Sequence, residues 1–148
     1  MPVRFPPDYT LAAIAKAHPR SKFNSVEQIV DAWLATKALQ HQKKHRSTTK
    51  VLLGATGTIA GYYTLATRQV DLGDLPPDLI RKLPRHALPV AMLAWLGLDS
   101  SRQGDGLGRR LFAQALADCF RAGEVFAFIA VIGRRVPLPA NWHRSLLA

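Results

Sequence analysis

The sequence predicts an α/β protein of the α+β kind, in which a mixed central sheet is flanked by helices. Three observations lead to this prediction. An amphipathic helical stripe comes first, a hairpin and a long apolar strand follow it, and a second amphipathic helix then leads into another apolar strand. With 148 residues, 48% of them hydrophobic and 20% charged, the chain has the size and composition of one globular domain.

The first third of the chain is expected to hold one long helix. Residues 1–22 contain three prolines in their first seven positions, so we expect an irregular or weakly helical lead-in there. Ser25 and Gln28 then have the spacing of a helix capping box. Apolar residues follow at helical period, namely Val26, Ile29, Val30, Trp33 and Leu34. The helix is expected to end near residue 44, in a basic run that suits a helix C-terminus.

A β-hairpin is predicted next, with strands at residues 50–54 and 58–67 around the turn Gly-Ala-Thr-Gly. Strand alternation sends Tyr62 and Tyr63 to opposite faces of the sheet. Residues 71–87 contain three prolines and are expected to form a connection with one short helical turn.

The second half of the chain predicts a strand, a helix and a strand. Residues 88–99 form the long central strand, residues 107–121 an amphipathic helix, and residues 124–132 a second buried strand. Cys119 lies on the apolar stripe of this helix, so we expect an inert, buried thiol rather than a reactive one.

The chain is strongly basic, with 20 Lys and Arg against 10 Asp and Glu and a formal charge of +10. Residues 1–50 hold nine basic residues against three acidic ones, and residues 101–148 hold seven against three. Such a surplus attracts polyanions, nucleic acid above all. An ordinary solvated surface is the alternative explanation.

Composition also excludes several classes of protein. The single cysteine rules out an internal disulfide and a cysteine-based zinc site. The five histidines show no paired-ligand spacing, so no metal is expected, and no serine nucleophile elbow occurs. No apolar run reaches the length of a membrane span, about 18 residues. The N-terminus lacks the apolar segment of a signal peptide, so we expect a cytoplasmic protein with no membrane partner.

The stretch most informative about function is Gly-Leu-Asp-Ser-Ser-Arg-Gln-Gly-Asp-Gly-Leu-Gly at residues 97–108. A buried strand enters a glycine-rich turn there, and the turn opens a helix. Unpaired backbone N–H groups and the positive end of the helix dipole favour a phosphate or pyrophosphate ligand. A P-loop lysine is absent, and the last spacing does not fit a dinucleotide-binding fingerprint. The pattern Q/R-x-x-G-x-G/A is met by Gln103, Gly106 and Gly108.

That pattern is the acetyl-CoA pyrophosphate loop of the GNAT N-acetyltransferases, and the sequence resembles the GNAT toxins of toxin–antitoxin systems over roughly residues 20–132. The blocks that carry the resemblance are Phe23-Asn24-Ser25, Asp31-Ala32-Trp33-Leu34, Ile59 to Ala66, Leu88-Pro89-Val90 and Arg102 to Gly108. The resemblance implies that two parallel strands splay apart and that acetyl-CoA inserts between them. The residues implied to bind acetyl-CoA are Leu96, Leu98, Arg102, Gln103, Gly104, Gly106, Leu107, Gly108 and Arg109.

The resemblance also implies an acyltransferase that acetylates the amino group of aminoacyl-tRNA. Implied partners are a DNA-binding antitoxin and a second copy of the chain. The expected RNA contacts are Arg20, Lys22, Lys43, Lys44, Arg46, Arg81, Lys82 and Arg85. The alternative acceptor is a small amine or a protein N-terminus. Such an acceptor would need acidic residues in the cleft, and residues 71–78 offer three aspartates.

The sequence departs from the family after about residue 132. In the family, the acid that protonates the departing thiolate is usually a tyrosine on a later helix, and no tyrosine follows Tyr63 here. Pro137 and Pro139 oppose a helix at that place. The fold is therefore expected to lack the last helix and strand pair of the family.

We accordingly expect an incomplete GNAT domain over residues 23–132 and an irregular tail over residues 133–148, from truncation or a shifted reading frame. Acetylation is expected to be impaired, and a terminal histidine such as His143 is expected to be merely solvated; a genuine short variant that uses His143 as a substitute acid is the less favoured alternative. The alternative is a catalytically inactive remnant that only binds CoA, antitoxin or nucleic acid.

Overall fold

The computed structural model describes residues 3–70, 77–80, 88–125 and 131–133. The strands are β1 (Thr10–Ala13), β2 (Thr48–Leu53), β3 (Ile59–Val70), β4 (Leu88–Leu98) and β5 (Val131–Gly133). The helices are α1 (Gln28–Thr36), α2 (Ala38–Lys43), α3 (Pro77–Ile80) and α4 (Leu107–Val125), with single 3-10 turns η1 (Arg20–Lys22) and η3 (Ser100–Arg102).

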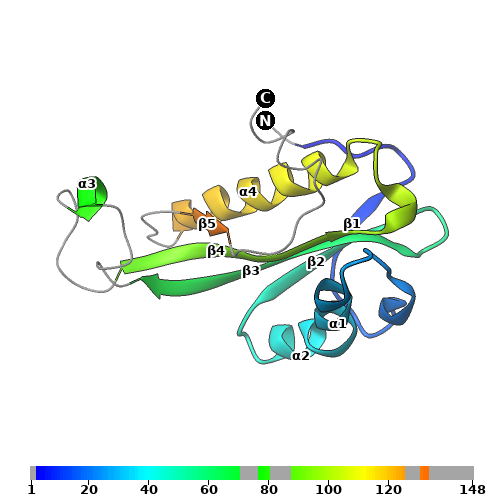
Figure 1. Ribbon diagram of the computed structural model, residues 1–148, viewed down its shortest axis with the longest axis horizontal. Coiled ribbons are helices and arrows are strands. Elements are labelled where there is room, and N and C mark those ends of the chain that lie inside the picture. The colour runs from blue at the N-terminus through cyan, green and yellow to red at the C-terminus, as the bar shows by residue number, and fades with distance from the viewer. Residues whose placement is uncertain (1–2, 71–76, 81–87, 126–130, 134–148) are drawn as a thin grey trace.

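The five strands form one sheet in the order β1-β2-β3-β4-β5. Neighbours from β1 to β4 are antiparallel, and β5 runs parallel to β4. Helices α1 and α2 cover one face of the sheet and α4 covers the other (Figure 1). The predicted α+β class, with a mixed sheet between helices, is confirmed. No helix in the described part of the chain is long and apolar enough to cross a bilayer.

The prediction of an irregular lead-in over residues 1–22 is wrong for β1. Thr10–Ala13 is a strand that pairs antiparallel with β2, with Thr10 opposite Leu53 and Ala13 opposite Lys50. Its hydrogen-bond partners lie far along the chain. Local propensity carries no signal of such pairing, because a short edge strand is stabilised by its neighbour.

The single helix predicted from residue 25 to residue 44 is two helices, α1 and α2, that meet at Lys37. The predicted capping box is also wrong, since Glu27 is the N-cap residue of α1. Ser25 instead donates from its hydroxyl to Asp31 Oδ1 at 2.7 Å. Val26 has a φ of 78°, which turns the chain ahead of the helix. The buried stripe consists of Val30, Leu34 and Ala38, while Val26 and Ile29 are exposed.

The predicted hairpin is confirmed, and so is the prediction that Tyr62 and Tyr63 point to opposite faces of the sheet. Tyr62 packs in a cluster with Val30, Leu34 and Trp95 on the α1 side of the sheet. Tyr63 packs on the other face, in the cluster that α4 completes. Strand β3 therefore contributes to two separate cores, one under each layer of helices.

Gly97 in β4 shows how closely α1 approaches the sheet. A Cβ built at this position would lie 2.6 Å from Val30 Cγ1 and 3.1 Å from Tyr62 Cε1. No real Cβ atom tolerates a separation of 2.6 Å, so only glycine fits between the helix and the ring. The close packing of α1 on β4 therefore requires a glycine at position 97.

The second half of the chain matches the prediction with one correction. Strand β4 and helix α4 are present, and Cys119 is buried as expected. Helix α4 continues to Val125, so the strand predicted from residue 124 is helical at its start, and β5 is described only at Val131–Gly133. Within the connection 71–87 the structure describes the short helix α3. The tail 134–148 lies outside the described residues, and with it the expectation that the last helix and strand pair are lacking, as well as His143.

Candidate cofactor and acceptor sites

The glycine-rich loop begins at Asp99, directly after β4. The Asp99 carboxylate accepts hydrogen bonds from Ser101 N and Asn24 N, each at 3.1 Å. Burial alone would raise the pKa of Asp99, but these hydrogen bonds and the charge of Arg102 hold the pKa below its ordinary value. The ionised carboxylate therefore ties the start of the loop to the segment that precedes α1.

The loop itself is open at its two central glycines. Gly104 has a φ of 98° and Gly106 a φ of 76°, and a Cβ at either position would meet nothing within 4 Å. Helix α4 starts one residue later at Leu107, which is buried together with Gly108. The main chain around the free N–H groups of the first turn of α4 is thus uncrowded. This geometry fits a phosphate or pyrophosphate.

Strand β4 directs backbone groups of two residues away from β3 beside this loop. Asp99 N donates to Ala60 O at 2.7 Å. Because hydrogen-bonded and non-hydrogen-bonded pairs alternate in an antiparallel ladder, Leu96 and Leu98 must direct their own N–H and C=O groups away from β3. On that side, the described pairing with β5 ends where Leu93 lies opposite Gly133. Within the described residues, the edge of β4 beyond Leu93 thus has no strand partner on that side, and it leads directly to the glycine-rich loop.

The polar side chains predicted for this loop take different positions. Gln103 donates from Nε2 to Leu98 O at 3.4 Å, across the turn. Arg102 turns toward the N-terminal segment, where it donates to Tyr9 Oη at 2.8 Å. Arg109 is exposed on the first turn of α4. Only Arg109 therefore presents its guanidinium freely to solvent beside the loop.

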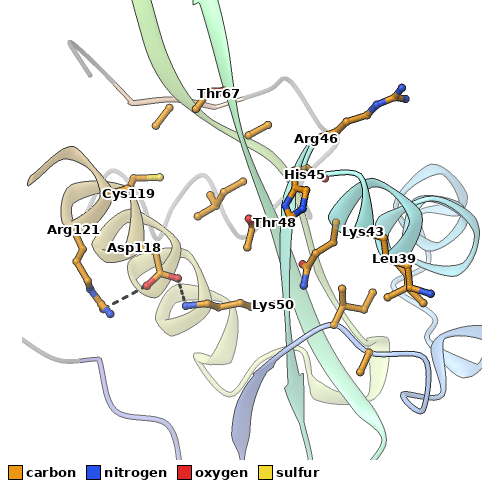
Figure 2. A pocket seen from close by; sticks show the side chains of 18 of the residues that line it. Leu39, Lys43, His45, Arg46, Thr48, Lys50, Thr67, Asp118, Cys119 and Arg121 are labelled. Carbon is orange, nitrogen blue, oxygen red and sulfur yellow. Dashed lines mark hydrogen bonds and ion pairs between the residues drawn. The ribbon is translucent and has the colours of Figure 1, made fainter. Parts of the chain in front are cut away.

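A second candidate site lies between the end of α2 and the C-terminal half of α4, where β3 extends beyond β2. It is a cavity of about 1320 Å³, and Figure 2 shows its lining. Its apolar walls include Ile14, Leu39, Leu65 and Ala91. Its basic side chains are Lys16, Lys43, His45, Arg46, Lys50 and Arg121. An apolar cavity with a cationic surround suits an anionic ligand that also has an apolar part.

The predicted RNA contacts divide into three groups. Lys43 and Arg46 line the cavity. Lys44 is the C-cap of α2 and exposed, and Arg20 and Lys22 lie on η1, so these three are not part of the lining. The remaining three, Arg81, Lys82 and Arg85, lie outside the described residues.

Asp118 of α4 is the acidic residue in the described cavity lining, and all of its acceptor positions are used. Oδ2 accepts from Lys50 Nζ at 2.9 Å and from the Tyr63 hydroxyl. Oδ1 accepts from Gln114 at 2.9 Å and faces Arg121 at 3.5 Å (Figure 2). Burial would raise the pKa of Asp118, but these donors outweigh it and lower the pKa. Asp118 therefore anchors cations at the cavity wall and is a poor base.

Each tyrosine of the chain already has a hydrogen-bond partner. Tyr62 donates to Val30 O at 2.6 Å, and Tyr63 donates to Asp118. Burial raises the pKa of both phenols, and the carboxylate raises that of Tyr63 further. Tyr9 accepts from Arg102. The hydroxyl protons of Tyr62 and Tyr63 are therefore already donated within the protein, whereas the Tyr9 hydroxyl is an acceptor for Arg102.

Sequence reasoning missed six residues of these two sites, namely Tyr9, Lys16, His45, Lys50, Asp118 and Arg121. Strand alternation could have placed Lys50 beside Tyr63, since the two are directly opposite in the ladder. No local sequence pattern predicts that Lys16 lines the cavity or that Tyr9 contacts Arg102. No cluster of three His, Cys, Asp or Glu side chains suited to a metal occurs within the part of the chain described here.

The fold and the loop together define an acetyltransferase of the GNAT class, and comparisons with known proteins agree. No family model matches the sequence. A tRNA-acetylating toxin of Mycobacterium tuberculosis is 30% identical over 119 residues, which are 80% of this chain and 70% of that protein. The chain belongs to this family, the GNAT toxins of toxin–antitoxin systems.

Solved structures of such toxins share the fold. AtaT complexed with acetyl-methionyl-tRNA has a TM-score of 0.81 and 21% identity, covering 95% of this chain and 86% of that one. A tyrosine-to-phenylalanine mutant of KacT has a TM-score of 0.83 and 23% identity, with the same coverage. A mutant of AtaT bound to acetyl-CoA and the C-terminus of the antitoxin AtaR has a TM-score of 0.72 and 19% identity, covering 95% and 82%.

Proposed function

We propose that this protein is a toxin that transfers the acetyl group of acetyl-CoA to the amino group of aminoacyl-tRNA. The observation that carries the proposal is the alignment of the open edge of β4 with the glycine-rich loop. The relatives support the substrates, because one is named a tRNA-acetylating toxin and another was solved with acetyl-methionyl-tRNA. The AtaT complex with AtaR supports an antitoxin as the regulatory partner.

The chain's own backbone would bind acetyl-CoA along its length. The N–H groups from Gln103 to Gly108 hold the pyrophosphate, and Arg109 adds a charge-assisted contact. The outward groups of Leu96 and the outward N–H of Leu98 pair with the pantetheine arm as an added strand would, while Leu98 O accepts from Gln103. N–H groups of β4 then lie near the thioester oxygen, where negative charge develops. The neutral amine forms the new C–N bond as the C–S bond breaks, and the thiolate takes up a proton.

The positive charge of the cavity favours aminoacyl-tRNA as the acceptor over a small amine or a protein N-terminus. Six of its lining residues are Lys, Arg or His, and the carboxylate of Asp118 is fully engaged. A cationic small amine or a protein N-terminus would meet repulsion there without a free acidic partner among the described residues; Asp71 and Asp74 lie outside them. A tRNA acceptor instead gains from neutralised phosphates. Lys43 and Arg46 are the predicted RNA contacts that this observation favours.

Acetylation of charged tRNA tests the proposal directly. The protein is incubated with acetyl-CoA and a mixture of aminoacyl-tRNAs, the ester bonds are hydrolysed, and N-acetyl amino acids are measured by mass spectrometry. We expect N-acetyl amino acids from tRNA and none from free amino acids at the same concentration. Acetylation of free amines alone would contradict the RNA acceptor. Acetyl-CoA binding without any transfer would favour the alternative, a binding-only remnant, which the engaged tyrosines also favour.

A further inference from the structure

The N-terminal arm, residues 3–9, holds the glycine-rich loop from both sides. Ahead of the loop, Arg102 donates to Tyr9 Oη at 2.8 Å. Behind it, Arg110 of α4 donates to Arg4 O at 2.8 Å. Phe5 and Tyr9 also pack against the core cluster under α4. In Figure 1 this blue segment runs alongside the start of α4 before it enters β1.

The contact between Tyr9 and Arg102 is the more specific of the two. The Arg102 guanidinium carbon lies 5.5 Å from the centre of the Tyr9 ring, within range of a cation–π interaction. The other side of the guanidinium faces the β2–β3 turn, where Nη2 would lie 3.4 Å from a Cβ at Gly54. One aromatic ring thus fixes the arginine that immediately precedes the loop.

The middle of the loop, from Gln103 to Gly106, has few contacts of its own. A Cβ at Gly104 or Gly106 would meet no atom within 4 Å, so neither glycine packs against the protein. Gln103 reaches Leu98 O only at 3.4 Å. The geometry of the loop therefore depends on the residues at its two ends, and the arm contacts both.

We propose that Tyr9 is a positioning residue that orders the pyrophosphate loop through Arg102, and that the N-terminal arm preorganises the cofactor site. The inference rests on the proposed function, because it takes acetyl-CoA as the ligand of this loop. A preorganised loop loses less conformational entropy when the ligand binds, so affinity rises without a new contact to the ligand.

Two ligands separate this role from general stability. Acetyl-CoA contacts the loop through its pyrophosphate, whereas S-acetylpantetheine has no pyrophosphate and occupies only the strand edge. Tyr9→Ala should weaken acetyl-CoA binding about tenfold and Tyr9→Phe about threefold, since a hydrogen bond to a charged group is lost in each. Binding of S-acetylpantetheine should change less than about twofold.

Calorimetric titration of both ligands tests the proposal, with Tyr63→Phe as the matched control. Tyr63 belongs to the same core cluster and also loses a hydroxyl hydrogen bond, but it lies away from the loop. Tyr63→Phe should leave both affinities unchanged. In an Arg102→Lys background, Tyr9→Phe should have no further effect, because the pair acts as a unit. Equal losses for both ligands, or no loss for acetyl-CoA, would overturn the positioning role.

Hydrogen exchange on the ligand-free protein keeps this inference separate from the proposed function. Tyr9→Ala should speed exchange of the amides from Gln103 to Gly108, relative to those in the middle of α4. Unchanged exchange there would overturn the arm's role even if acetyl-CoA binds. Failure of the wild-type protein to bind acetyl-CoA would overturn the proposed function. The exchange rates would then test only whether the N-terminal arm orders the loop.

Discussion

Tyr62 and Tyr63 are neighbours in β3, yet their hydroxyls bind helices on opposite faces of the sheet. Tyr62 donates to the Val30 carbonyl in α1 at 2.6 Å, and Tyr63 donates to the Asp118 carboxylate in α4. The strand therefore fastens both helical layers through two consecutive side chains. Loss of either hydroxyl would leave a buried acceptor with one donor fewer, at a cost of about 1 kcal/mol.

Asp118→Asn should reduce stability in a pH-dependent way. The folded-state pKa of Asp118 lies below its unfolded value, so its contribution is full above the unfolded pKa and is lost as pH falls through the folded pKa. The stability difference between wild type and mutant should therefore be largest near neutral pH and shrink below about pH 4. Urea unfolding at several pH values measures it, and a constant difference would contradict the depressed pKa.

Gly106→Ala and Gly106→Asp test the pyrophosphate loop. A side chain at φ 76° is strained, and aspartate adds a negative charge beside the phosphates. We expect acetyl-CoA affinity to fall about tenfold for alanine and further for aspartate. Calorimetric titration measures this.

Gly57→Ala is the matched control for that loop. Gly57 has a φ of 79° and equally open surroundings, but it lies in the β2–β3 turn. It should lose similar stability without losing affinity for acetyl-CoA. Equal affinity of all three variants and wild type would contradict the assignment of the loop.

Charge reversal at Lys43 and Arg46 tests the cationic cavity. The double variant Lys43→Glu/Arg46→Glu should weaken tRNA binding strongly and lower the slope of log affinity against log salt by about 2. Arg4→Glu/Lys37→Glu makes the same charge change at exposed residues outside the lining and should affect binding much less. Filter binding at several salt concentrations gives both slopes. Equal effects of the two pairs would indicate a general charge effect rather than a site.

Turnover by the 148-residue chain should be slow. The hydroxyl protons of Tyr62 and Tyr63 are donated to Val30 and Asp118, no tyrosine follows Tyr63 in the sequence, and general acid catalysis is worth about 10² to 10⁴-fold. Release of CoA with charged tRNA measures the rate. Fast turnover would mean that another group donates the proton. In that case His143→Ala should remove the activity, with His18→Ala as the control.

The elements that local pattern determines were predictable, and those that depend on distant contacts were not. The hairpin, β4 and α4 follow from hydrophobic period and turn residues, and the glycine-rich loop follows from its place between strand and helix. Strand β1 was missed because its pairing partner is β2. The helix start was missed because Val26 adopts a positive φ that only its surroundings stabilise. The cavity joins residues from both halves of the chain, which no local period reveals.

The close approach of Val30 to Gly97 limits the order in which this chain can accept substitutions at the two positions. A methyl group added at position 97 would collide with the Val30 side chain, so a larger residue there must await a smaller one on α1. That order passes through a protein with a void between helix and strand, which costs stability but still folds. A larger residue at position 97 thus requires a smaller one at position 30, whereas a smaller residue at position 30 requires no change at position 97. A lineage that exchanges volume across this interface must lose the valine side chain before it gains one at the glycine.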